Sequence, residues 1–457
     1  MAEMLGHPLR HSVGPTDSST AGRRPKLPPR ARRAVLAATV GTAIEWYDYS
    51  LYGTVAALVA GQLFFPGASP GVGLLAAFAT FGVAYLARPF GGIVIGHIGD
   101  KYGRKPALMS SLVLMGTATF AIAFLPTYET IGIWATVFLV LLRLAQGFGA
   151  GAELAGALTV VAEHTPVARR GFYTSLSQTS SLVGVLLASV AFLFVSGMPE
   201  DQLLSWGWRV PFLTAGLLFV VALYVRAKLE ESPEFDQAID EASEARATKA
   251  PISRVLKSRR REIALAFVLM GANNVLTYTL ITYVTSYLKN TVGMSAMAAL
   301  TATSIGTAVG IIANPIAGHL CDRFGYRRVW SIALVATILG IVPFFAGLQT
   351  GNLLVCSLCM SLAFLITYAG TAGAYSGVFA NLFPTEVRYS GVAFTKETSG
   401  ALIAGPTPFV ATALVLAADG SARFLVLYIL AWVVASLVVL YKIGSIAENP
   451  EEPNLLL

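Results

Sequence analysis

The chain has 457 residues, of which 55% are hydrophobic and only 12% charged, and its mean hydropathy is +0.67. A soluble domain usually carries about 25% charged residues, so we expect the solvent of this chain to be a lipid bilayer. The net charge of +7 does not indicate nucleic-acid binding, because the basic residues are divided among many separate segments.

Residues 1–33 are rich in Pro, Ser, Thr and Arg without an apolar period, which predicts a disordered cytoplasmic tail. Twelve apolar stretches follow, each near the roughly 20 residues that a helix needs to span a bilayer. We expect these spans at 34–60, 73–98, 107–125, 131–160, 171–196, 209–227, 262–287, 296–318, 328–348, 352–379, 390–416 and 423–444.

The order of these stretches predicts two matched halves. A polar cytoplasmic linker at 228–261 separates a six-helix bundle at 34–227 from a second at 262–444, and 445–457 forms a cytoplasmic tail. The sequence lacks the alternation of polar and apolar residues that is typical of β-barrel strands. The expected fold class is therefore an all-α membrane protein with twelve transmembrane helices in two pseudo-symmetric halves.

The basic residues predict the orientation. With both termini in the cytoplasm, 26 of the 32 Lys and Arg residues fall in cytoplasmic segments and three lie within spans. This bias is the positive-inside pattern, and it predicts a multi-pass protein of the inner (cytoplasmic) membrane with both termini in the cytoplasm.

One loop motif occurs twice. Residues 96–105 read GHIGDKYGRK and residues 318–327 read GHLCDRFGYR, an offset of 222 residues. Glycine permits a tight turn in each copy, and each aspartate can pair with basic residues to hold one face of the protein closed. The candidate gate residues, with those of a second pair of similar loops, are Asp100, Gly103, Arg104, Lys105, Glu153, Glu163, Arg170, Asp322, Gly325, Arg327, Glu386 and Arg388.

The doubled motif resembles the signature loop of the major facilitator superfamily, although Tyr326 replaces a usual basic residue. Four further motifs, in residues 41–49, 88–92, 143–153 and 229–235, resemble in this order those of the metabolite:proton symporter family. The resemblance implies the major facilitator fold, alternating access, and a central cavity lined by the first, fourth, seventh and tenth spans. It implies substrates such as citrate, dicarboxylates, shikimate, aromatic acids, or proline and betaine.

Ionisable residues in the middle of a span cost about 2.5–3.5 kcal/mol each, so they usually face a cavity. Glu45 and Asp48 lie three residues apart in the first span, and two close carboxylates resist double ionisation, which suits proton coupling. The alternative is a fixed ion pair of either carboxylate with Arg88 or Arg143. Glu397 is a third candidate for the proton.

Arg143 is expected to hold a substrate carboxylate, because its planar, permanently charged fork suits that group. The alternative role for Arg143 is that of a structural partner for Glu45 or Asp48. For the tyrosines, the alternative to substrate binding is packing. The candidate substrate-binding residues are Arg143, Arg88, Gln146, Tyr52, Asn274, Tyr278, Tyr283, Tyr368, Tyr375 and Lys396.

Three basic residues within the membrane favour an anionic substrate. The sequence therefore predicts a monomeric symporter that takes up a small organic acid together with protons. The alternatives are a proline or betaine symporter and an exporter of the same superfamily. No nucleophile–base set, metal cluster or phosphate loop is present in the sequence, so we expect no enzyme, cofactor, metal or nucleic-acid partner, and the proton gradient supplies the energy.

Overall fold

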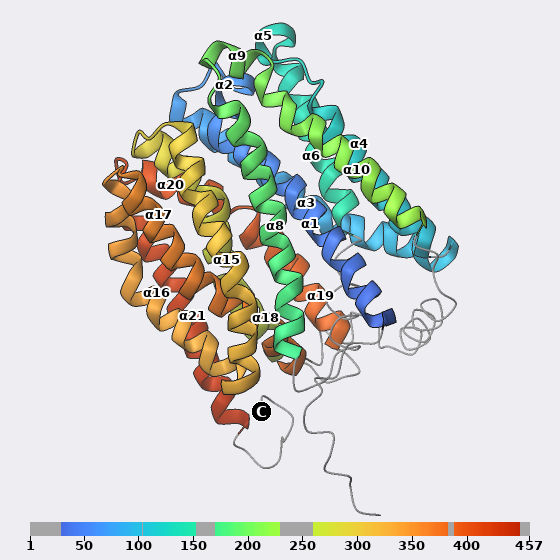
Figure 1. The fold of residues 1–457 in the computed structure, drawn as a ribbon, viewed down its shortest axis with the longest axis vertical. Helices are drawn as coiled ribbons and strands as arrows, with labels where there is room; N and C mark the ends of the chain where they lie inside the picture. Colours follow the sequence, from blue (N-terminus) through green and yellow to red (C-terminus); the bar gives the residue numbers. More distant parts are fainter. Residues whose placement is uncertain (1–28, 103, 152–169, 229–258, 383–387, 448–457) are drawn as a thin grey trace, which may run out of the picture.

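The computed structural model describes residues 29–102, 104–151, 170–228, 259–382 and 388–447, and every regular element within them is a helix (Figure 1). Both predicted tails and the linker at 228–261 fall almost entirely outside the described residues. The six helices of the N-terminal half run close to the predicted spans. They are α1 (Pro29–Leu58), α3 (Pro70–Tyr102), α4 (Arg104–Ile122), α6 (Ile133–Ala150), α8 (Arg170–Ser196) and α10 (Val210–Lys228).

Short helices connect these six at one end of the bundle, namely α2 (Ala60–Phe64), α5 (Tyr128–Ile131), α9 (Glu200–Ser205) and η3 (Gly207–Arg209). The predicted fourth span was expected to reach residue 160. Helix α6 is described to Ala150, and residues 152–169 lie outside the described part.

The C-terminal half contains three continuous helices, α15 (Ala296–Phe324), α16 (Tyr326–Gln349) and α21 (Arg423–Ala447). Its other three spans include π-helical turns, which frequently occur at functional sites. These spans consist of α13 (Arg260–Tyr278), η4 (Thr279–Tyr283), α14 (Val284–Ser286) and η5 (Tyr287–Thr291); α17 (Leu353–Leu362), η6 (Ala363–Tyr368) and α18 (Ala369–Leu382); and α19 (Arg388–Ser399), η7 (Gly400–Ala404) and α20 (Thr407–Leu416).

The predicted plan of twelve spans in two halves is confirmed. Nine helices of the described residues are long and apolar enough to cross a membrane, and two shorter apolar helices are Met109–Ile122 and Gly207–Val221. Helix α1, with 30 residues, completes the set. The two halves lie beside each other with their helices roughly along one common direction (Figure 1).

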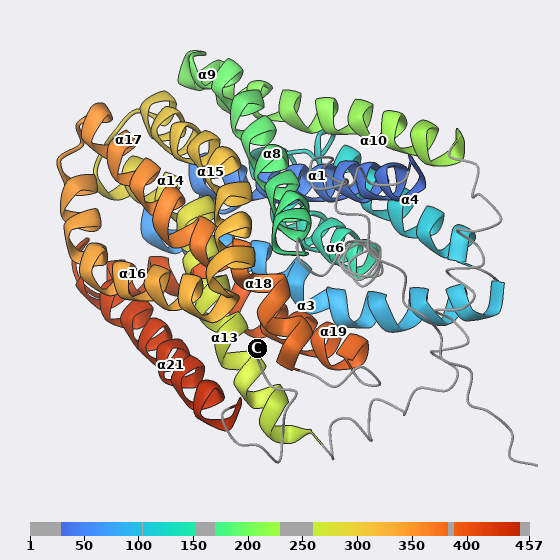
Figure 2. The same cartoon turned by 60° about the horizontal axis from the view of Figure 1, so that its bottom comes forward.

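The two halves pack closely along α8 and α15, which lie side by side in both views (Figures 1 and 2). At the opposite end of α1 from Pro29, Asn290 Nδ2 donates to the carbonyl of Ala57 at 2.9 Å, and Lys289 Nζ donates to that of Leu58. The seventh span is thereby fastened to the end of the first.

Helices α3 and α6 approach each other through glycines. A Cβ on Gly147 would lie 1.9 Å from the carbonyl oxygen of Ala84, and one on Gly91 would lie 1.8 Å from that of Phe148. Such distances leave no room for any side chain. The contact fixes the register of α6 against α3, and with it the position of the charged residues that both helices carry.

Candidate functional site

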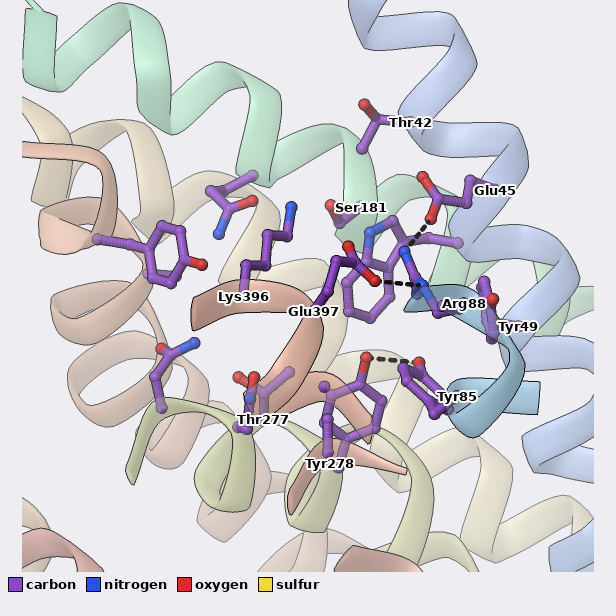
Figure 3. Close-up of a pocket in the computed structure, with 18 of the residues that line it drawn as sticks. Thr42, Glu45, Tyr49, Tyr85, Arg88, Ser181, Thr277, Tyr278, Lys396 and Glu397 are labelled. Carbon is purple, nitrogen blue, oxygen red and sulfur yellow. Dashed lines mark hydrogen bonds and ion pairs between the residues drawn. The ribbon is translucent and has the colours of Figure 1, made fainter. Parts of the chain in front are cut away.

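A cavity of about 90 Å³ lies between the halves and is lined from α1, α3 and α8 on one side and from α13, the α17–α18 span and the α19–η7 span on the other (Figure 3). Eight predicted site residues line it. They are Glu45, Arg88, Asn274, Tyr278, Tyr368, Tyr375, Lys396 and Glu397.

Four charged side chains, Glu45, Arg88, Lys396 and Glu397, form the cavity charge group. Arg88 Nη2 donates to Glu45 Oε1 at 3.0 Å, and Arg88 Nε lies 3.6 Å from Glu397 Oε2 (Figure 3). Glu45 and Arg88 belong to the N-terminal half and Glu397 to the C-terminal half. One buried arginine therefore joins a carboxylate of its own half to a carboxylate of the other.

Lys396 and Glu397 diverge from neighbouring positions on α19, as the helical step of about 100° requires. Glu397 reaches Arg88, whereas Lys396 Nζ has no hydrogen bond and no carboxylate within 4.0 Å among the described residues. In Figure 3 the Glu397 side chain points toward Arg88 and lies between Arg88 and Lys396. Among the described lining residues, Arg88 is thus paired with carboxylates and Lys396 is not.

Aromatic rings close the wall around Arg88. Its guanidinium carbon lies 5.1 Å from the ring centroid of Tyr49 and 5.3 Å from that of Tyr85, within cation–π range. The hydroxyls of Tyr85 and Tyr278 share a hydrogen bond of 2.6 Å across the two halves, and Trp46 stacks on Tyr278 at 6.0 Å.

Four buried polar atoms of the cavity wall have no hydrogen-bond partner in the described structure. They are Tyr49 Oη, Arg88 Nε, Ser181 Oγ and Asn273 Oδ1. Buried polar groups are usually paired, because an unpaired one costs about 1–3 kcal/mol. A polar molecule in the cavity would find hydrogen-bond partners already in place.

A second polar group, the one-half cluster, consists of Asp48, Thr119, Arg143 and Gln146, all within the N-terminal half. Gln146 Nε2 donates to both Asp48 oxygens at 2.9 and 3.1 Å, and Thr119 Oγ1 donates to Oδ1. Arg143 Nη1 donates to Gln146 Oε1 at 2.8 Å. Asp48 has no cation within 4.0 Å among the described residues, so the arginine reaches it only through the amide.

The one-half cluster does not line the cavity. Arg143 is 0% exposed, and its guanidinium carbon lies 4.0 Å from the ring centroid of Tyr52, whose hydroxyl bonds Thr80. Tyr283 also lies away from the cavity, packed near Phe78. The substrate roles predicted for Arg143, Gln146, Tyr52 and Tyr283 therefore have no support from the cavity in this conformation.

The predicted proton-coupling pair is also divided. Glu45 lines the cavity and is bonded to Arg88, which matches the ion-pair alternative, whereas Asp48 belongs to the one-half cluster. Residues three apart on a helix point about 60° apart. The cavity lies on the Tyr49 side of Glu45, so Asp48 faces the neighbouring helices instead.

Asp322 connects the two halves at the second copy of the loop motif. Its oxygens accept from the backbone N–H groups of Gly171 at 2.7 Å and Phe172 at 3.0 Å, in the first turn of α8. The predicted pairing with basic residues is not found in the described structure, since Arg327 donates to the carbonyl of Tyr441. Gly325 has φ +85°, as a tight turn requires.

The remaining gate predictions lie outside the described residues or side chains. They concern Asp100, Gly103, Arg104, Lys105, Glu153, Glu163, Arg170, Glu386 and Arg388. Within the described part, no group of three or more His, Cys, Asp or Glu side chains is arranged to hold a metal ion.

Sequence reasoning assigned no site role to more than half of the lining residues, although their spacing contains a signal. Each helix contributes positions three or four apart, which share one face. Starting from Glu45, Arg88, Tyr278, Tyr368 or Glu397, that spacing leads to the neighbours on the same span, whereas α8 offered no predicted residue from which to start. The unassigned lining residues are Thr42, Trp46, Tyr49, Tyr85, Gln178, Ser181, Asn273, Thr277, Ala372, Gly400 and Ala404.

The sequence profile of the Major Facilitator Superfamily matches residues 38–408. The chain belongs to this superfamily. As a member of the Major Facilitator Superfamily it is a multi-pass membrane transport protein for a small molecule and not an enzyme.

Two curated relatives in the superfamily differ in their substrates. The chain is 39% identical over 402 residues to the glycine betaine/proline/ectoine/pipecolic acid transporter OusA of Dickeya dadantii, covering 84% of this chain and 78% of the relative. It is 37% identical over 407 residues to the shikimate transporter of Escherichia coli, covering 88% and 92%.

A solved major facilitator structure shares the fold. The crystal structure of a D-xylose-proton symporter aligns with a TM-score of 0.70 at 18% identity, covering 89% of this chain and 96% of that chain. At this identity the match establishes the fold alone.

Proposed function

We propose that the protein is a proton-coupled symporter for a small zwitterion of the glycine betaine or proline type. The similarity to the betaine and proline transporter supports this substrate class. The sequence-based expectation of an organic acid depended on three basic residues within the membrane. Of these, Arg143 lies outside the cavity and Arg88 is engaged by two carboxylates.

The balance of charge in the cavity is the observation that carries the proposal. Its lining has two carboxylates, Glu45 and Glu397, and two cations, Arg88 and Lys396, so their formal charges cancel. An anion would leave an uncompensated charge in a buried site, which is expensive in a low-dielectric medium. A zwitterion adds no net charge and can face both signs.

The size and the rings of the cavity agree with such a substrate. Pockets for drug-sized ligands hold about 300–1,000 Å³, whereas this cavity of about 90 Å³ suits a much smaller molecule. Aromatic faces attract quaternary ammonium groups, and Trp46, Tyr49, Tyr85 and Tyr278 lie on its wall.

We assign proton binding to Asp48. Burial in a low dielectric disfavours the charged form of a carboxylate unless a cation compensates it. Asp48 is 1% exposed and is held by an amide and a hydroxyl, with no cation in direct contact among the described residues. Its position outside the cavity lets a proton and a substrate bind at the same time.

The basic residues support an orientation with both termini in the cytoplasm of the cell. In that orientation Asp322 and α8 meet at the cytoplasmic face, where their contact would act as a gate. Lys289 and Asn290 would then close the outer face against α1.

An organic anion is the second candidate, favoured by the similarity to the shikimate transporter. Uptake by proteoliposomes separates the two. We expect radiolabelled glycine betaine or proline to accumulate when the lumen is more alkaline than the medium, and not after a protonophore is added. Accumulation of shikimate or a dicarboxylate, without betaine or proline, would overturn the zwitterion proposal.

A further inference from the structure

We propose that Lys396 is the residue that selects substrates with a carboxylate. This inference deepens the proposed function and depends on it. Of the two cations of the cavity, Arg88 alone has carboxylate partners within 4.0 Å among the residues that the structure describes.

Arg88 is already engaged by a carboxylate of each half. Its guanidinium is shared by Glu45 at 3.0 Å and Glu397 at 3.6 Å, and it lies against the rings of Tyr49 and Tyr85. A substrate carboxylate on Arg88 would compete with Glu45 and Glu397 for the same cation.

Lys396 has the opposite properties. Its ammonium lines the same cavity with no carboxylate within 4.0 Å and no hydrogen bond in the described part of the chain. An ammonium group has three donors and no acceptor. An anion brought by the substrate would satisfy these donors and neutralise the charge.

Glu397 has a positioning role in this arrangement. Because it is held by Arg88, it is directed away from Lys396, and the lysine stays available although a carboxylate is its neighbour in sequence. Arg88, Glu45 and Glu397 together carry a formal charge of minus one, so they attract the cationic end of a zwitterion. The substrate is thereby oriented with its carboxylate on α19 and its ammonium toward the α1–α3 wall.

The inference predicts a reversal of preference between two ligands of nearly equal size. Glycine betaine and choline share a quaternary ammonium, but only betaine has a carboxylate. Lys396 attracts betaine and repels choline. In Lys396→Gln the cavity gains a net negative charge, so betaine affinity should fall at least about tenfold, as for the loss of one charged hydrogen bond, while choline affinity rises.

Binding to purified protein in nanodiscs, measured by calorimetry, tests this inference. Lys396→Met should repeat the result with an apolar chain of similar length, and Lys396→Arg should keep the preference for betaine. The matched control is Lys442→Gln, an exposed lysine near the end of α21, which should bind both ligands as the wild type does.

The outcomes are distinct. Betaine affinity within threefold of wild type in Lys396→Gln or Lys396→Met overturns the inference. Loss of both ligands by variants with a normal melting profile also overturns it, since Lys396 would then support the cavity as a whole. If the wild type itself binds neither betaine nor proline, the proposed function fails, and that result is separate from any result on the variants.

Discussion

The cavity charge group and the one-half cluster each contain a buried arginine and a buried carboxylate, yet they connect different parts of the molecule. Arg88 joins Glu45 of its own half to Glu397 of the other. Arg143, Gln146 and Asp48 stay within one half. Separation of the halves at the cavity must break the first group, whereas the second can remain intact.

This difference indicates that the two groups have different roles. A contact between the halves influences which conformation is populated, because its energy differs between the conformation in which the halves meet at the cavity and the one in which they are separated. A contact within one half has no such differential energy unless its protonation changes the helices around it. Variants of the two groups should therefore differ in kind as well as in size.

The largest effect is expected for Arg88→Ala. It leaves the buried Glu45 and the partly exposed Glu397 without their shared cation, and breaking a buried pair costs about 3–5 kcal/mol. We expect loss of uptake and a clearly lower melting temperature in detergent. The double variant Arg88→Ala with Glu45→Gln should recover part of the thermal stability. An Arg88→Ala protein as stable as wild type would contradict the assigned ion group.

Glu397→Gln should be milder, because Arg88 keeps Glu45. Only the bridge between the halves is lost, so the fold should persist while the balance of conformations shifts. A loss of about 1.4–2.8 kcal/mol changes that balance ten- to a hundredfold. Accessibility of a cysteine introduced into the cavity, measured by maleimide labelling, should change accordingly. Unchanged labelling and turnover would show that the bridge does not control conformation.

Asp322→Asn removes a charge that accepts two backbone N–H groups of α8. We expect turnover to fall about five- to tenfold with substrate affinity within a few-fold, since the contact is remote from the cavity. Asp419→Asn is the matched control, because Asp419 is exposed and its φ of +53° suits asparagine equally. Equal effects of the two substitutions would show that the contact between Asp322 and α8 does not control turnover.

The smallest effect is expected for Thr119→Val in the one-half cluster. It removes one hydroxyl donor from Asp48 while Gln146 continues to donate to the same carboxylate. A typical hydrogen bond contributes about 0.5–1.5 kcal/mol net, and Gln146 compensates for part of this loss, so we expect accumulation to fall two- to fivefold without loss of binding. Thr117→Val, on the exposed side of α4, should have no effect.

The sequence predicted the spans well because each needs an unbroken apolar run, and it located the turn at Gly325 because glycine there has positive φ. It could not decide which face of a helix meets the cavity. Arg143 lies on a span expected to line the cavity, but its side chain contacts Tyr52 of α1 and Phe81 of α3. The sequence alone does not distinguish a polar residue that pairs with a neighbouring helix from one that binds a substrate.

The motif residues Gly91 and Gly147 illustrate a second limit. The sequence resemblance marks them as family features without saying why. In the structure they are points where α3 and α6 touch backbone to backbone. Their role is therefore packing, and they influence the site by setting the position of Arg88 and Gln146.

In the proposed mechanism the proton binds Asp48 and the substrate binds the cavity, so the two use separate groups. The Asp48→Asn variant in proteoliposomes separates these roles, when gradient-driven accumulation of glycine betaine is compared with exchange of labelled for unlabelled betaine at equal pH on both sides. We predict that accumulation is abolished while exchange stays within about threefold of wild type, since the cavity is intact. Accumulation at the wild-type level would show that Asp48 does not bind the coupling proton, and loss of exchange in a folded protein would show that proton and substrate do not use separate groups.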